Sequence, residues 1–225
     1  MKNKHILALL FWGAACCLAS EPFPDEQPHT PPEIGVQGAL WLSIFPVEGG
    51  FDVPATAIPV RKAPDVTSPL IMTIKVPSDV NSREIEYEAN AALAYNQYPG
   101  WFQIKTRMGL GWVAEKNTLR FDPIEKLLLG KMTYLAKDEW DGTIYESASF
   151  SSKRIQITWK QTEMGAYPAN LLGQKWSGGQ LWLNVLLPKK EICTDATVLD
   201  ADTRGWVPAY SLKGNLVMWL YSRGC

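Results

Sequence analysis

The sequence of 225 residues predicts a mainly β protein built from two small β units that a short helix joins. Apolar residues alternate with polar ones in short runs, and glycine, proline and asparagine separate these runs, which is typical of antiparallel strands. A single segment carries clear helix signals. The second half of the chain repeats the first half in outline, which favours two small units over one large one.

The first twenty residues have the layout of a secretory signal peptide. Lys2 and Lys4 precede an apolar stretch over residues 6–18, and small residues follow it. A membrane-spanning helix needs about 20 apolar residues, and this stretch is shorter. We therefore expect residues 1–20 to be cleaved and the mature chain to be exported to the periplasm without a transmembrane segment.

The four cysteines form two groups. Cys16 and Cys17 leave with the signal peptide, or one of them carries the lipid if the protein is a lipoprotein instead. Cys193 and Cys225 remain, and two cysteines in an exported chain suggest one disulfide. Two free thiols are the alternative. A disulfide would hold the last residue of the chain in place.

A proline-rich leader follows over residues 21–37. Within 21–33 the sequence has five prolines and four acidic groups but hardly any residue that could enter a core, so an extended, solvated segment is expected. His29, which is the histidine that remains after cleavage, lies in this segment. A histidine in a solvated leader is more often a bystander than a catalytic group.

The first β unit is expected over residues 38–121. Its strand signals are the runs 57–60, 70–74, 85–88, 101–104 and 112–113. The segment 82–97 also contains alanines and glutamates that suit a helix, but tyrosine alternation favours strand, loop and strand.

The predicted helix lies at about 123–129. Asp122 is a candidate N-cap, Pro123 suits the first helical position and Glu125 completes a capping box. Gly130 can supply the left-handed residue that ends the helix. Leu127, Leu128 and Leu129 should be buried between the two units. The predicted organisation is a signal peptide (1–20), a leader (21–37), a first unit (38–121), a linker helix (122–130) and a second unit (131–225).

An aromatic strand followed by Gly-Trp-Val occurs in each unit. The motif residues are Gly111, Trp112 and Val113 in the first unit and Gly205, Trp206 and Val207 in the second. We expect the glycine to permit a tight turn, the tryptophan to cap a small barrel and the valine to fill its core.

This repeated pattern resembles the bacterial SH3-like (SH3b) domain. Residues 59–64 are similar to the opening segment of that family, and residues 143–148 are their counterpart. The resemblance implies two tandem SH3-like β barrels, the second of which carries an insertion at 188–204. Residues 219–225 are similar to the end of a group of exported bacterial SH3-like proteins that has no assigned activity.

Charge and composition argue against several classes of function. A net charge of −1 gives no basis for binding DNA or RNA. The cysteines and histidine are not placed for Cys-His or Ser-His-Asp catalysis, and no His/Cys cluster suggests zinc. Asp200, Asp202 and Gly205 imitate the start of a calcium loop, but Arg204 and Leu212 occupy ligand positions. We expect no metal, no cofactor and no enzymatic activity.

The densest acidic patch contains Glu139 and Asp141. These residues are the one pair that could serve as glycosidase carboxylates. Asp141 and Gly142 are also a common hairpin turn pair, and the turn is the favoured interpretation.

Nine tryptophans remain after cleavage, and most are expected in the core. The aromatic residues beside predicted turns form a candidate ligand groove: Tyr98, Trp101, Trp140, Trp182 and Tyr210. The leading hypothesis is a non-catalytic envelope-binding protein that recognises peptidoglycan peptide or glycan. The alternative is a periplasmic protein-protein interaction or scaffold protein without affinity for the cell wall.

Overall fold

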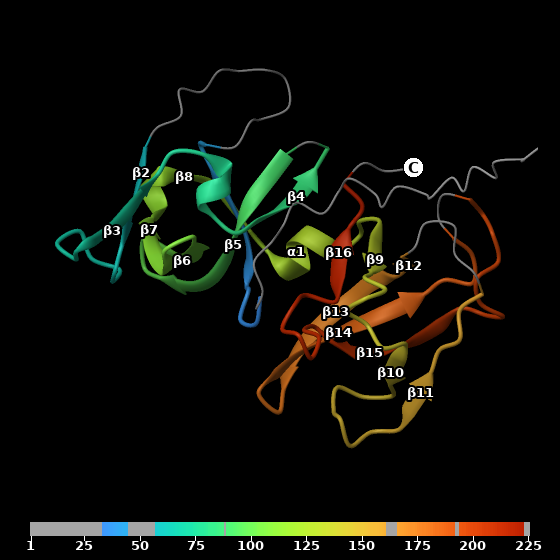
Figure 1. The fold of residues 1–225 in the computed structure, drawn as a ribbon. Coiled ribbons are helices and arrows are strands. Elements are labelled where there is room, and N and C mark those ends of the chain that lie inside the picture. The colour runs from blue at the N-terminus through green and yellow to red at the C-terminus, as the bar shows by residue number, and fades with distance from the viewer. Residues whose placement is uncertain (1–32, 45–56, 88, 161–165, 192–193, 223–225) are drawn as a thin grey trace, which may run out of the picture.

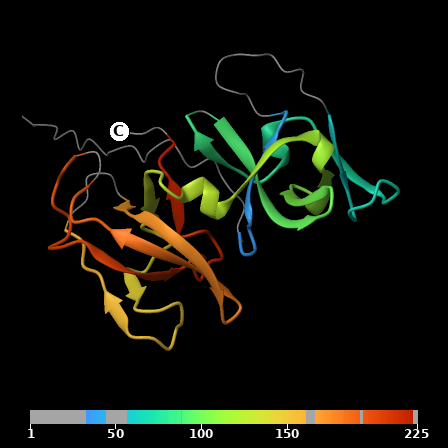
Figure 2. The same ribbon diagram turned by 180° about the vertical axis from the view of Figure 1, so that it is seen from behind.

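The fold is mainly β, with several antiparallel sheets. A computed structural model describes residues 33–44, 57–87, 89–160, 166–191 and 194–222. The predicted signal peptide, most of the leader and all four cysteines, including Cys193 and Cys225, lie outside the described residues. The described chain forms two lobes, over residues 38–123 and 133–220, and a short helix lies between them in both views (Figures 1 and 2).

The first lobe contains one sheet of eight strands. They are β1 (Gly38–Leu42), β2 (Ile58–Arg61), β3 (Leu70–Ile74), β4 (Ser82–Glu86), β5 (Ala89–Tyr98), β6 (Trp101–Thr106), β7 (Gly109–Ala114) and β8 (Thr118–Pro123). Their order is β3-β2-β7-β6-β5-β1-β8, and β4 pairs with β5. Two short 3-10 helices, η1 (Pro77–Asp79) and η2 (Glu115–Asn117), connect strands. The prediction of strand, loop and strand over 82–97 is confirmed by β4 and β5.

The second lobe contains two sheets. Its strands are β9 (Thr133–Leu135), β10 (Thr143–Tyr145), β11 (Arg154–Gln156), β12 (Tyr167–Pro168), β13 (Asn170–Ser177), β14 (Gln180–Leu187), β15 (Thr203–Pro208) and β16 (Met218–Leu220). Five of them form a sheet in the order β11-β10-β15-β14-β13, and the others form the sheet β12-β9-β16.

The two lobes share one strand order. Strands β3-β2-β7-β6-β5 of the first lobe correspond in sequence and in space to β11-β10-β15-β14-β13 of the second. Arg61 pairs with Trp112 in the first lobe, and Tyr145 pairs with Trp206 in the second. This register is the one expected if residues 59–64 and 143–148 are counterparts.

The Gly-Trp-Val residues lie within β7 and β15, so the prediction that their glycines form tight turns is wrong. A Cβ at Gly111 would lie 2.4 Å from Cγ1 of Val60, and one at Gly205 would lie 3.0 Å from the carbonyl oxygen of Tyr145. The glycines are therefore positions where the neighbouring strand approaches closely. Val113 and Val207 are fully buried, whereas Trp112 and Trp206 are half-buried.

Helix α1 (Ile124–Leu128) is shorter than predicted, and its caps differ. Asp122 does not cap it, because this residue belongs to β8 and accepts hydrogen bonds from Nε1 of Trp41 at 3.0 Å and Nε of Arg120 at 2.6 Å. Leu129 is exposed rather than buried. Gly130 has the expected left-handed conformation, with φ of 69°.

Strand β1 is buried on both faces, and each face contacts a different core. Leu40 and Leu42 point into the interior of the first lobe, whereas Ala39 and Trp41 join the core that the two lobes share. Strand β5 alternates in the same way, with Ala92 and Ala94 in the first core and Ala91, Leu93 and Tyr95 in the shared one. The period of two along a strand therefore links the lobes.

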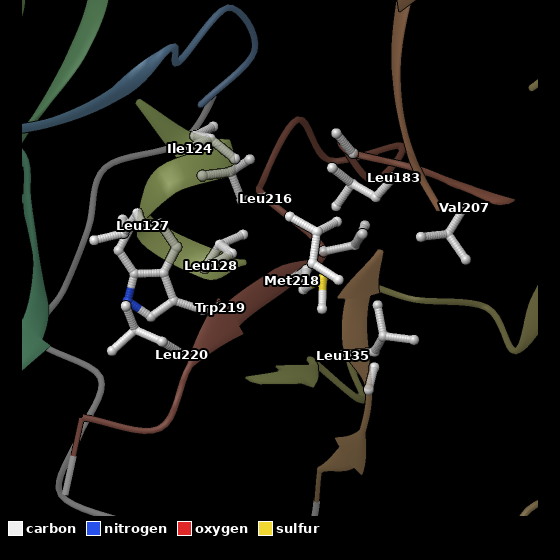
Figure 3. Close-up of a cluster of buried hydrophobic side chains, with 14 of the residues drawn as sticks. Ile124, Leu127, Leu128, Leu135, Leu183, Val207, Leu216, Met218, Trp219 and Leu220 are labelled. Atoms are coloured by element: carbon white, nitrogen blue, oxygen red, sulfur yellow. The ribbon is translucent and has the colours of Figure 1, made fainter. Parts of the chain in front are cut away.

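The shared core also receives helix α1 and the last strand. Leu127 and Leu128 of α1 lie beside Trp219 and Leu220 of β16, and Leu135 and Met218 extend the cluster toward the second lobe (Figure 3). A core that takes side chains from both lobes should make them unfold together.

Residues 33–37 do not continue the solvated leader that the sequence predicts. Glu33 is completely buried and forms an ion pair with Arg83, with both carboxylate oxygens 2.9 Å from the guanidinium nitrogens. Glu33 also accepts the backbone N–H of Leu216 at 2.7 Å. A buried charge is stable only when it is paired and hydrogen-bonded, and Glu33 meets this requirement by contacting both lobes.

Candidate functional site

Three of the five predicted groove aromatics are buried. Trp140, Trp182 and Tyr210 are each less than one tenth exposed, so the prediction that they line an exposed groove is wrong. Trp140 donates its Nε1–H to the carbonyl of Thr143, and the hydroxyl of Tyr210 donates to the carbonyl of Val36. Buried Trp and Tyr side chains usually place their polar atoms in this way.

The other two, Tyr98 and Trp101, lie together on the surface. They are directly opposite each other at the end of the β5–β6 hairpin, and residues in that relation present their side chains on the same face. Tyr98 is 57% exposed and Trp101 is half-buried. The structure thus retains a two-residue aromatic surface from the predicted groove.

An open concavity of about 480 Å³ lies beside Trp101, and we refer to it as the Trp101 concavity. Its lining comes from the β2–β3 loop, the β5–β6 turn, the end of β7 and the start of η2: Val66, Gly100, Trp101, Ala114, Glu115 and Lys116. The aromatic ring, the small apolar groups and one charge of each sign provide both stacking and polar contacts for a small ligand.

The β2–β3 loop at the edge of this concavity is held in one conformation by its own side chains. Oγ of Ser68 accepts the backbone N–H of Ala63 at 2.8 Å, and Oδ1 of Asp65 accepts that of Thr67 at 2.7 Å. The Thr67 amide is the main group that lowers the pKa of Asp65. Val66, at the tip of the loop, is therefore presented on a preorganised turn.

The β10–β11 loop of the second lobe repeats these hydrogen bonds position by position. Three backbone N–H to carbonyl bonds occur in both loops. In the β2–β3 loop they join Lys62 to Pro69, Asp65 to Ala63 and Ser68 to Asp65. In the β10–β11 loop the corresponding bonds join Glu146 to Lys153, Ser149 to Ser147 and Ser152 to Ser149. Oγ of Ser152 accepts the N–H of Ser147, as Oγ of Ser68 accepts that of Ala63. Val66 and Phe150 therefore occupy equivalent positions.

In the second lobe the place equivalent to the Trp101 concavity is filled. The rings of Phe150 and Trp182 lie 4.8 Å apart between centroids, and the ring of Tyr145 lies 5.6 Å from that of Phe150. Trp182 in this cluster is only 1% exposed. Sequence reasoning missed Phe150, although extending the match between 59–64 and 143–148 by two residues aligns it with Val66.

A second concavity, of about 310 Å³, lies between the lobes. Its lining residues are uncharged: Val36, Gln37, Gln97, Phe121, Pro123, Ile124, Gln174, Trp176 and Leu181. Oε1 of Gln174 is buried there without a hydrogen-bond partner. None of the predicted groove residues lines this concavity.

Glu139 has a structural role instead of the proposed catalytic one. It accepts hydrogen bonds from Oγ of Ser211 at 2.6 Å and from Nδ2 of Asn215 at 2.9 Å. Burial alone would raise the pKa of Glu139, but these bonds and the charge of Lys213 outweigh it, so the pKa is lowered. A carboxyl group that stays ionised is a poor general acid. Asp141 accepts the backbone N–H of Thr143 and so forms a local turn. The prediction of a hairpin at Asp141 and Gly142 is wrong, because the flanking strands β9 and β10 belong to different sheets.

The lowered pKa of Glu139 leads to a prediction about acid stability. Its folded pKa lies below the ordinary 4.5, so its contribution is present above about pH 4.5 and is lost as the pH falls through the folded pKa. Glu139→Gln should therefore reduce the free energy of unfolding at pH 7 by about 1–2 kcal/mol, with a smaller difference at pH 3. Urea unfolding at the two pH values measures this effect.

The control for this experiment is Glu146→Gln, which removes one partner of the exposed ion pair with Lys153. Exposed pairs contribute about 0–1 kcal/mol, so this variant should differ little from the wild type. An equal loss for Glu139→Gln at pH 3 and pH 7 would contradict a role for its charge.

Potential metal and membrane sites gain no support within the described part of the chain. No group of three or more metal-ligating side chains occurs in the described ranges. Asp202 accepts the backbone N–H of Lys189, and Asp200 pairs with Lys160, so both carboxylates act in loop structure. Among these same residues, none of the helices has the length and apolar character needed to cross a bilayer. Comparison of the chain with protein-family models and with curated proteins yields no match.

Proposed function

We propose that this protein is a non-catalytic binding protein of the bacterial cell envelope whose first lobe recognises peptidoglycan peptide or glycan at the Trp101 concavity. In this proposal the two lobes are tandem SH3-like barrels joined by α1. The chain is exported to the periplasm after loss of residues 1–20, and Cys193 forms a disulfide with Cys225.

The observation that carries the proposal is the difference between two equivalent places in the repeat. The concavity beside Trp101 is open, whereas its counterpart at Trp182 is filled by Phe150. Filling a surface hollow with an aromatic side chain buries apolar area and is favourable. An open aromatic hollow therefore forgoes that stabilisation, and exposed apolar sites of this kind often serve ligands.

The chemistry of the rim suits a wall fragment. Glu115 and Lys116 are exposed and both line the concavity, so it offers one acceptor and one donor of opposite charge. A stem peptide carries both carboxylate and amine groups, and a sugar ring offers an apolar face to Trp101. Tyr98 extends the aromatic surface on the same side of the hairpin.

The test is co-sedimentation of the mature protein with intact peptidoglycan sacculi. We expect binding that persists at higher salt, because aromatic contacts and hydrogen bonds are screened less than surface charge pairs. Trp101→Ala should weaken binding at least about thirtyfold, since buried aromatic anchors contribute about 2 kcal/mol or more. The far-UV circular dichroism spectrum should not change.

Trp176→Ala is the matched control. Trp176 is 59% exposed and lines the second concavity, which shares no lining residue with the Trp101 concavity, so this variant should bind as the wild type does. Loss of binding in Trp176→Ala together with normal binding in Trp101→Ala would overturn the assigned site. A wild-type protein that stays in the supernatant would overturn wall binding and favour a protein partner.

A further inference from the structure

We infer that the second lobe contains a second copy of the ligand site and that Phe150 occupies it as a built-in plug. This inference rests on the proposed function of the first lobe and extends it to the second lobe, where Phe150 packs against Trp182, one of the predicted groove residues. It predicts that the protein has one open site, and that a change at the tip of a single loop opens the second.

The floors of the two sites are equivalent by strand register. Trp101 pairs with Ala114 across β6 and β7, two residues before the Gln103–Trp112 pair. Trp182 pairs with Pro208 across β14 and β15, two residues before the Asn184–Trp206 pair. The two tryptophans thus stand at the same point relative to the Gly-Trp-Val motif. Their indole rings are the natural floors of two related sites.

The loops beside the two tryptophans, β2–β3 in the first lobe and β10–β11 in the second, are equivalent in their hydrogen bonds. The β2–β3 and β10–β11 loops share their backbone bonds and a serine hydroxyl that closes the turn. Both loops therefore bring the side chain of their fifth residue to the same place, Val66 in one and Phe150 in the other. The residue at the tip of the loop is thus the small Val66 in the first lobe and the larger Phe150 in the second.

Phe150 lies over the floor without being part of the core. It is 60% exposed although it contacts Trp182, which is itself almost fully buried. The Phe150 ring therefore contacts the indole at a tilt of 58° and leaves most of its own surface in solvent. Tyr145 packs edge-on against both rings, with interplanar angles of 85° and 82°. A ring in this position can be removed without leaving a cavity inside the lobe.

The rims of the two sites differ in charge. Tyr145, whose hydroxyl accepts a hydrogen bond from Nη2 of Arg154 at 3.1 Å, corresponds to Arg61 of the first lobe, which does not line the Trp101 concavity. Glu115 and Lys116 correspond to Ala209 and Tyr210, which are buried. An opened second site would therefore bind the same apolar group with fewer polar contacts and lower affinity.

The experiment exchanges the two loop tips in the full mature chain. Isothermal titration with a soluble disaccharide-tetrapeptide muropeptide counts the sites in the wild type, in Phe150→Val, in Val66→Phe and in the double variant. We expect one site in the wild type and two sites in Phe150→Val. Val66→Phe should bind at least tenfold more weakly than the wild type. The double variant should have one site. In the double variant the remaining site should not depend on Trp101.

A second measurement reports the plug without a ligand. In protein labelled with 5-fluorotryptophan, the Trp182 fluorine resonance, assigned with a Trp182→Phe variant, should gain solvent exposure in Phe150→Val and not in Val66→Phe. The matched control is Leu212→Val, which changes a fully exposed apolar side chain elsewhere in the second lobe. It should alter neither the number of sites nor the fluorine spectrum.

The outcomes separate this inference from the proposed function. A wild type with one site that Trp101→Ala abolishes, together with a Phe150→Val variant that also has one site, overturns the inference and leaves the function intact. A wild type without a site, together with a Phe150→Val variant that gains one, overturns the function and supports the inference. Absence of binding both in the wild type and in Phe150→Val overturns the proposed function and the inference together.

Discussion

Arg83→Ala should lower the free energy of unfolding by about 3–5 kcal/mol, because it leaves the Glu33 carboxylate buried without its cationic partner. The side chains of Arg83 and Glu33 are 10% and 0% exposed, and the pair is bidentate. The guanidinium also lies 4.8 Å from the ring centre of Trp219. Urea unfolding monitored by tryptophan fluorescence measures the loss.

The matched variants are Glu33→Ala and the double variant. Removal of both charges avoids an uncompensated buried ion, so the double variant should lose less stability than the two single losses together. Arg107→Ala is a surface control, since its ion pair with Asp79 leaves Arg107 63% exposed, and it should change stability by less than about 1 kcal/mol. Additive losses in the cycle would contradict the assigned pair.

The Glu33–Arg83 pair was not predictable from the sequence. Glu33 lies in a proline-rich stretch that resembles a solvated leader, and its partners lie 50 and 183 positions away. A local pattern cannot indicate which distant segment will surround a charge. The backbone N–H of Glu33 also donates to the carbonyl of Gly214, so this segment is fixed between the lobes by contacts that only the folded chain creates.

The strand pattern was predictable because alternation records which side chains point into a core. The segments 70–74 and 101–104 became β3 and part of β6, and the match of 59–64 with 143–148 held in the observed register. Helix capping was misread at Asp122, because the same side chain can cap a helix or accept bonds within a strand. Here Trp41 and Arg120 supply those donors from β1 and β8.

The exposure of the five candidate groove aromatics was predictable only in part. Tyr98 and Trp101 beside the β5–β6 turn do reach the surface, but position beside a turn does not decide which face of the sheet a ring occupies. The ring of Phe150 packs against Trp182, and the hydroxyl of Tyr210 donates a hydrogen bond to the carbonyl of Val36, which precedes β1. Both contacts depend on tertiary packing. The hydrogen bonds that the β2–β3 and β10–β11 loops share identify equivalent positions in the two lobes more directly, because they match Val66 with Phe150.

Trp219→Ala should cost about 3–5 kcal/mol, as truncation of a fully packed aromatic residue does. Trp219 packs on α1 in the core that both lobes share (Figure 3). Its Nε1–H donates to the carbonyl of Glu84 in the first lobe at 2.7 Å. Trp219→Phe keeps most of the ring and loses this bond, so it should cost less than the alanine variant.

Trp219 also tests whether the lobes are one cooperative unit. Because its ring belongs to a core that β1, β5, α1 and β16 build together, its loss should lower the stability of both lobes in a single transition. Hydrogen exchange at amides of β6, whose buried residues Phe102 and Ile104 belong to the core of the first lobe and not to the shared one, should accelerate along with that of β16. The exposed Trp176→Ala should leave stability within about 0.5 kcal/mol of the wild type. Protection of β6 that survives while β16 opens would show that the lobes unfold separately in spite of the core they share.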